Sequence, residues 1–174
     1  MFDPTVYDNV KVVLEGEIYE LDFSKKISII NRRDIVDLAS MSRTFMMAFK
    51  KYDSKSTHPF AEIHLHTNLH QFQKELLEND SQSVGCTLHV NFYIKLIHDD
   101  SEGKDIEKYL TGLWGQDMKL TQEIYYNYHL PNEKYNKISL LLQGMFHEDN
   151  VDDLIMVIQR TYQVLQQFTL RYGN

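Results

Sequence analysis

Apolar and polar residues alternate most regularly between residues 86 and 97. Every second position there is apolar, and the positions between carry polar side chains or tyrosine. The apolar set is Cys86, Leu88, Val90, Phe92, Ile94 and Leu96, and the other set is Thr87, His89, Asn91, Tyr93 and Lys95. A period of two is typical of a β-strand with one face in the core, so this segment is predicted to be a half-buried strand.

Weaker alternation predicts strands on both sides of this segment. One strand is expected at 61–66, and an extended stretch at 44–51 precedes it across a polar loop. Two more, at about 120–130 and 138–147, flank the turn-rich residues 131–136. A turn-rich connection between two strands predicts an antiparallel hairpin.

The N-terminal third is predicted to begin with short strands. Residues 10–14 and 18–23 flank Glu15-Gly16-Glu17, which we interpret as the turn of a β-hairpin within residues 1–30. A third β-rich piece at 27–30 follows, and residues 34–40 are expected to form two helical turns.

Three further helices are expected from apolar residues at helical spacing. One covers about 69–78, with Thr67 or Asn68 as its N-cap. A helix of about ten residues follows Asp105 and ends near Gly115. The longest begins after Asn150, where two aspartates in the first turn favour the positive end of the helix dipole.

These elements predict an α+β fold, with a mostly antiparallel sheet and helices packed on one face. Residues 1–174 are expected to form a single domain. Within it, residues 27–79 and 86–171 share the order strand, helix, strand, strand, helix, which indicates either an internal duplication or a chance agreement of element order. The duplicated layout resembles that of bacterial effector-binding domains, which hold small molecules in a groove between two halves, although no motif of that group is present.

Composition narrows the class of partner. The 174 residues are 43% apolar and 25% charged, which is typical of a globular protein. A net charge of -7 argues against a nucleic-acid partner or an anionic membrane surface. Residues 1–60 are balanced, whereas residues 61–174 carry 16 acidic and 9 basic side chains, so the second part holds the whole excess.

A cytoplasmic location is the default expectation. The N-terminal residues lack the pattern of a signal peptide, and no apolar run approaches the length of a membrane span. Cys86 is the sole cysteine, which fits a reducing compartment because it has no internal disulfide partner.

Pairing the predicted faces gives a candidate binding surface. Side chains alternate between the two faces of a strand. If the apolar side chains face the helices, five of the eight histidines are therefore expected on the opposite face: His64, His66, His89, His129 and His147. The candidate binding residues are His64, His66, His89, Tyr93, Tyr125, Asn127 and Gln143. Such a surface fits a ligand cleft, a dimer interface or a pH-responsive surface. The alternative is that it is the ordinary polar side of an antiparallel sheet.

The sharpest chemical candidate is the HLHTNLH segment. His64 and His66 share one face of a strand, and His70 in the next helix is a possible third ligand of a zinc site. No aspartate follows His66 to complete a familiar hydrolase pattern. Glycine-rich nucleotide loops, GxSxG, HExxH and CxxC are absent from the sequence, so no cofactor, resident metal or catalytic residue is assigned.

The leading interpretation is a small cytoplasmic binding or regulatory module without enzymatic activity. It is expected to act on a protein partner or a small ligand, to form a homodimer, and to bind neither nucleic acid nor membrane. The alternative is a metal-dependent hydrolase that uses His64, His66 and His70. A third possibility is that the acidic part docks on a basic partner in a larger complex, which high salt would weaken.

Overall fold

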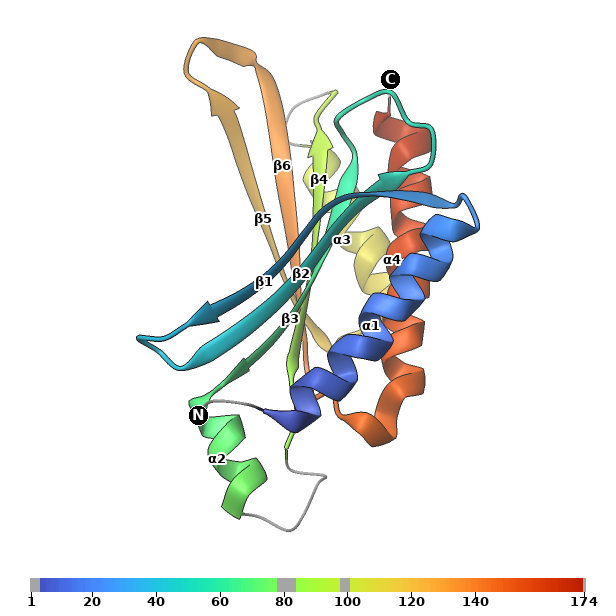
Figure 1. The fold of residues 1–174 in the computed structure, drawn as a ribbon. Coiled ribbons are helices and arrows are strands. Elements are labelled where there is room, and N and C mark those ends of the chain that lie inside the picture. The colour runs from blue at the N-terminus through green and yellow to red at the C-terminus, as the bar shows by residue number, and fades with distance from the viewer. Residues whose placement is uncertain (1–3, 78–83, 98–100, 174) are drawn as a thin grey trace.

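The computed structural model describes residues 4–77, 84–97 and 101–173, and within them six strands form one antiparallel sheet in the order β1-β2-β3-β4-β6-β5 (Figure 1). The strands are β1 (Ile27–Asp37), β2 (Ser42–Lys51), β3 (Phe60–Asn68), β4 (Thr87–Lys95), β5 (Met118–Asn127) and β6 (Leu130–Leu142). The helices are α1 (Thr5–Phe23), α2 (Leu69–Leu77), α3 (Ser101–Trp114), the short 3-10 helix η2 (Glu148–Asn150) and α4 (Val151–Tyr172).

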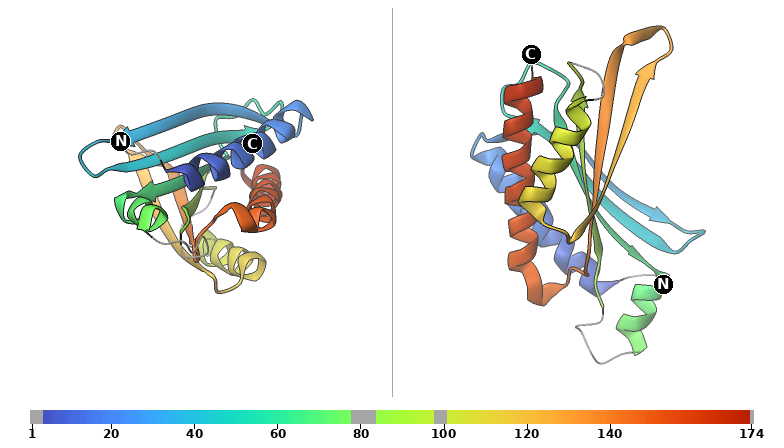
Figure 2. Two further views of the ribbon diagram at one scale, coloured as in Figure 1. Left: turned by 60° about the horizontal axis from the view of Figure 1, so that its bottom comes forward. Right: turned by 180° about the vertical axis from the view of Figure 1, so that it is seen from behind.

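The helices lie on one side of the sheet. In both views of Figure 2, α1, α3 and α4 cover the same face, and α2 extends the end of β3 at one end of the molecule. This arrangement confirms the predicted α+β class, with an antiparallel sheet and helices packed on one face. No helix in the described part of the chain is both long and apolar enough to cross a membrane.

The core fills the space between the sheet and these helices. The apolar residues of the alternating strands point into it, and Leu88, Val90 and Phe92 are fully buried. Burial of this kind supplies most of the stability of a fold, at about 25 cal/mol for each Å² of apolar surface removed from water. The assignment of the alternating apolar residues to the helix-covered face is therefore confirmed.

The predicted N-terminal hairpin is wrong, because residues 10–14 and 18–23 lie in the single helix α1. Its buried residues recur every three or four positions and pack in the core: Tyr7, Val10, Leu14, Ile18 and Leu21. Gly16 has no atom within 4 Å of the position a Cβ would take, so no turn or close contact requires glycine there. The β-branched residues of this segment favoured strands locally, and core packing of the helical stripe overrides that preference.

The predicted helix at 34–40 is also wrong. β1 continues to Asp37, paired with β2 as far as Ser42, and the connecting turn carries Met41 at a φ of +51°. The described part of this segment, residues 27–77, therefore contains three strands and then a helix. The element order that indicated a duplication is absent from the first half, and the duplication is not confirmed.

The C-terminal hairpin exists, but its turn lies earlier than expected. β5 and β6 pair from Met118 to Asn127, and residues 131–136 lie inside β6 instead of forming the turn. β6 ends at Leu142, before Gly144, whose φ of +97° favours glycine. The predicted strand at 138–147 is thus cut short by five residues.

Candidate functional site

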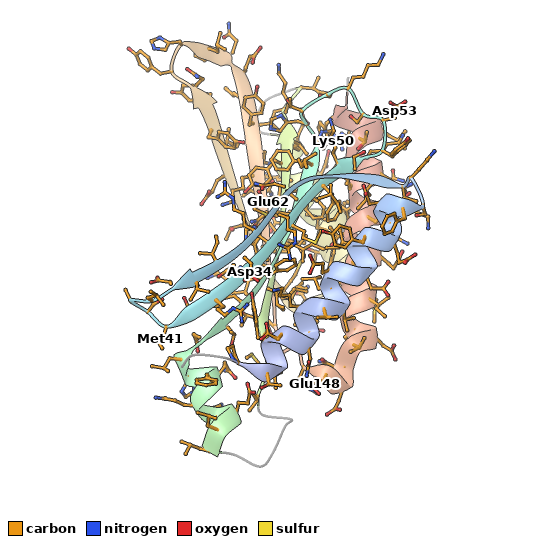
Figure 3. All side chains as sticks on the ribbon, viewed as in Figure 1. Asp34, Met41, Lys50, Asp53, Glu62 and Glu148 are labelled. Atoms are coloured by element: carbon orange, nitrogen blue, oxygen red, sulfur yellow. The ribbon has the colours of Figure 1, made fainter. Side chains whose placement is uncertain are left out.

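The candidate site lies on the face of the sheet opposite α1, α3 and α4, which we call the free face. Its central residues come from β3 and β4, whose register places His64 opposite His89, Glu62 opposite Asn91, and Phe60 opposite Tyr93. Residues directly opposite on neighbouring strands lie about 4.5–5.5 Å apart at their Cβ atoms, so these side chains meet. Figure 3 shows Glu62 near the middle of the sheet.

Glu62 is the hub of a hydrogen-bond network. Its Oε2 accepts from the hydroxyl of Tyr93 at 3.0 Å and lies 2.9 Å from Nε2 of His64. Burial alone would raise the pKa of the carboxyl, but the hydrogen bonds from His64 and Tyr93 outweigh it and lower the pKa. Glu62 is therefore ionised at neutral pH, with only 16% of its side chain exposed.

A small hollow lies beside this hub. It has a volume of about 290 Å³. Five residues with polar groups line it, although their carbon atoms form most of the exposed lining: Thr44, His64, His66, His89 and Asn91. Oγ1 of Thr44 lies 2.9 Å from Nδ1 of His66, which fixes the orientation of that ring. Burial lowers the pKa of both His66 and His89, and the neighbouring histidines lower that of His89 further. These two imidazoles are therefore neutral at pH 7.

Aromatic rings form a continuous row on the other side of Glu62. Phe60 and Tyr93 stack with their centroids 4.5 Å apart, and His58 lies 5.3 Å from Phe60 and 4.8 Å from Tyr135. Tyr125 stacks on Tyr135 at 5.6 Å. We call these five residues the ring cluster. It reaches from the loop before β3 across four strands, and Tyr93 joins it to Glu62.

The structure brings five of the seven predicted site residues to this surface. His64, His66 and His89 line the hollow, while Tyr93 and Tyr125 belong to the ring cluster. The other two lie elsewhere. The Oδ1 of Asn127 accepts a hydrogen bond from the backbone N–H of His129 in the β5–β6 turn, at 3.0 Å. Gln143 follows the end of β6 and lines a separate cavity of about 270 Å³ with Trp114 and residues of α4.

The remaining two histidines that parity placed on this face serve local structure. His129 lies in the hairpin turn, and the ring of His147 accepts a hydrogen bond from the backbone N–H of Asp149 at the start of η2. Strand parity fails for His147 because it lies beyond Leu142, where β6 has already ended.

Several residues of the site were missed in the sequence analysis. They are His58, Phe60, Tyr135 and Thr44. Glu62 and Asn91 were expected on this face but were not chosen as candidate binding residues. Phe60 and Glu62 lie four and two positions before His64 on the same strand, so the alternation of side chains already placed them on its face. Tyr135 carried no usable signal, because residues 131–136 were interpreted as a turn. His58 lies in a loop, whose path alternation does not describe.

The described structure does not gather the three histidines of the hydrolase alternative into one group of ligands. His70 lies exposed on α2, and among the described residues no group of three or more His, Cys, Asp or Glu side chains is placed to hold a metal ion. Cys86 is buried, and burial raises the pKa of its thiol to about 12, which leaves it without nucleophilic thiolate at neutral pH.

Charge differs between the two sides of the molecule. The free-face positions of the strands carry five basic side chains (Arg33, Lys50, Lys95, Lys119 and Lys137) and four acidic ones (Asp37, Glu62, Glu123 and Glu133). On the opposite side, α1 carries five acidic side chains and one basic. The free face is thus nearly neutral, whereas α1 carries more acidic than basic side chains.

Comparisons with models of protein families, with curated proteins and with solved structures find no match to this chain.

Proposed function

We propose that this protein is a binding module whose free face takes up a protein partner. The observation that carries the proposal is the ring cluster, five contiguous rings on a sheet face that no described helix covers. Tyrosine and other aromatic residues are enriched at protein interfaces, where a few of them supply most of the binding energy.

Exposed apolar side chains beside the cluster support the same function. Tyr125 itself is 43% exposed, and Tyr128, in the turn of the β5–β6 hairpin, is 86% exposed. This hairpin projects past the rest of the sheet (Figure 1). On the β1–β2 hairpin, which projects from the other side of the sheet, Ile35 is 48% exposed. A partner held between two projecting hairpins would cover apolar surface that now contacts water.

The partner that fits this surface presents apolar and aromatic side chains with hydrogen-bonding groups. Opposite charges nearly cancel on the free face, and Lys95 already pairs with Glu133 at 3.2 Å. Long-range attraction to a strongly charged partner would therefore be weak. Binding at this face should change little between low and high salt, whereas docking of the acidic part, residues 61–174, on a basic partner should weaken sharply.

A small ligand is the second candidate, supported by the histidine-lined hollow. Its volume of about 290 Å³ lies just below the roughly 300–1,000 Å³ that ligand pockets occupy. Its lining combines a few polar groups with a larger apolar surface, as in ligand pockets, but its size admits only a small ligand. Because the ring cluster spans four strands, we favour a protein partner, with the hollow as the place where one side chain of that partner enters.

The test is a quantitative comparison of two charge variants. Partners are first isolated by affinity capture, and the dissociation constant of the purified partner is then measured for each variant. Tyr125→Asp places a charge in the ring cluster and should weaken binding at least about tenfold, the loss typical of an interface hot spot. Glu20→Lys changes charge on the exposed side of α1 and should leave the affinity unchanged. Equal affinity of Tyr125→Asp and the unaltered protein would overturn the proposal.

A further inference from the structure

The sheet ends in two strands, β1 and β5, each with one side that pairs with no other described strand. Such an edge is a template for pairing with another chain, and proteins protect it with bulges, charges or covering elements. The two edges of this sheet differ in that protection. The difference indicates which of them is available for association.

The β1 edge carries two of these protective devices. A bulge between Ile29 and Asn31 interrupts its pairing with β2. Arg32 and Asp34 are tied to α1 through ion pairs with Glu15 and Lys11. A strand joining this edge would have to fit around the bulge and beside fixed charges.

The β5 edge has neither device over most of its length. Its register with β6 is regular from Met118 to Tyr126. Lys119, Thr121 and Glu123 alternate along its free-face side, and all three are exposed. No described residue forms an ion pair with Lys119 or Glu123, so both charges are available to a neighbouring strand.

We propose that a second copy of this chain pairs antiparallel with β5, with the two-fold axis at Thr121. In this register Lys119 lies directly opposite Glu123 of the partner subunit, and symmetry repeats the pair. Thr121 faces its own copy between the two ion pairs. Opposite charges and threonine pairs are both favourable directly across neighbouring strands. The segment is thus complementary to itself, as a two-fold interface requires.

The other side of β5 fits the same register. Met118, which packs against the core, would lie opposite Ile124 of the partner subunit, and Ile124 is 51% exposed in the single chain. The paired segment would be the nine residues from Asp117 to Tyr125. This is fewer than the roughly 20–30 residues a side of a standard interface, so the dimer should dissociate on dilution.

The dimer would extend the proposed binding surface. Residues directly opposite on antiparallel strands point to the same side of a sheet, so the two free faces would be continuous. Two ring clusters would then face the same way, and a partner with two contact sites would bind with higher avidity than either cluster provides alone.

A charge swap tests the interface. The Lys119→Glu variant would place two like-charge pairs in the interface. The dissociation constant of its dimer, measured by sedimentation of the full chain, should therefore rise by about tenfold or more. Glu123→Lys should do the same, and the double variant should restore the dimer because the pairs re-form in reverse. A monomer at every concentration for the unaltered chain, or no rescue in the double variant, would overturn the proposal.

Disulfide formation tests which edge strand the dimer uses and in which register. Thr121→Cys places two thiols across the axis, about 4.5–5.5 Å apart at Cβ, close to the about 3.5–4.5 Å that a disulfide spans, so oxidation should give a covalent dimer. Ile35→Cys is the matched control on β1, where a similar register would place Arg33 opposite Asp37 of the partner subunit. It should form no covalent dimer, although its β5 edge remains able to pair. A covalent dimer from Ile35→Cys but not from Thr121→Cys would show the opposite edge to be the interface.

Discussion

The two faces of the central strands differ sharply, although their residues alternate along the same backbone. On β3, Ile63 is fully buried, whereas the next residue, His64, keeps 26% of its side chain exposed. On β4, Phe92 packs edge-on against Phe168 of α4, while Tyr93 on the other face bonds to Glu62. The first face is apolar and close-packed, and the second is polar, aromatic and open.

This difference separates stability from recognition. The helix-covered face buries the apolar surface that stabilises the fold, so its residues have little freedom to change. The free face contributes less burial, and its rings and hydrogen bonds are accessible to a partner. Substitutions on the helix-covered face should therefore change the free energy of unfolding, whereas substitutions on the free face should mainly change binding.

The largest effect on stability is expected from Phe92→Ala. The ring is fully buried and contacts both Phe168 and Trp114, so its loss leaves a cavity in the core. The free energy of unfolding should fall by about 3–5 kcal/mol, as measured by urea denaturation. A loss as small as that of an exposed substitution would mean that the helix-covered face is not the stabilising one.

A smaller loss is expected from Asp34→Asn. Asp34 accepts from Lys11 of α1 and from Arg43 of β2, whose Nη2 lies 3.3 Å from Oδ2, so it connects helix and sheet. Removing the charge should lower the free energy of unfolding by about 1–2 kcal/mol. Figure 3 shows this residue apart from Glu62, and binding at the free face should not change.

The free face should make stability depend on pH. Burial lowers the pKa of His58, His66 and His89 below the ordinary value of 6.5 in the folded chain. Near and below that pH the unfolded chain therefore binds more protons than the folded chain. The free energy of unfolding should therefore fall as the pH drops from about 7.5 to 5.5. His89→Gln should reduce this slope, and an unchanged slope would contradict the assigned burial.

The smallest effect is expected from Lys95→Ala on the free face. Its ion pair with Glu133 is 3.2 Å long, but both side chains are more than 40% exposed. Exposed pairs of this kind contribute little, because solvent screens them and ordering two long side chains costs entropy. Thermal unfolding should show no change beyond measurement error, in contrast to Asp34→Asn.

The faces of β3 and β4 were predictable from sequence because one of them is buried almost completely. Leu88, Val90 and Phe92 recur without interruption, and a slip of one residue would expose them all. The N-terminal helix was not predictable in this way. Its residues Val10, Val13 and Ile18 favour strands locally, and only their packing in the core determines the helix.

The site was predictable only in part for a related reason. Alternation placed His64, His89 and Tyr93 on one face correctly, since all three lie inside regular strands. It could not place Tyr135 beside His58, because that contact joins β6 to a loop distant in sequence. Gln143 was misplaced for a different reason. The predicted strand continued to residue 147, whereas β6 ends at Leu142, so the alternation no longer applies at Gln143.

The most direct test of the account is the affinity of the purified protein partner for the Tyr125→Asp and Glu20→Lys variants, measured beside their stability. The account predicts that Tyr125→Asp loses at least about tenfold in affinity while keeping its stability, since the ring is 43% exposed. Glu20→Lys should keep both. Loss of binding in Glu20→Lys with full binding in Tyr125→Asp would place recognition on the helix side and contradict the account.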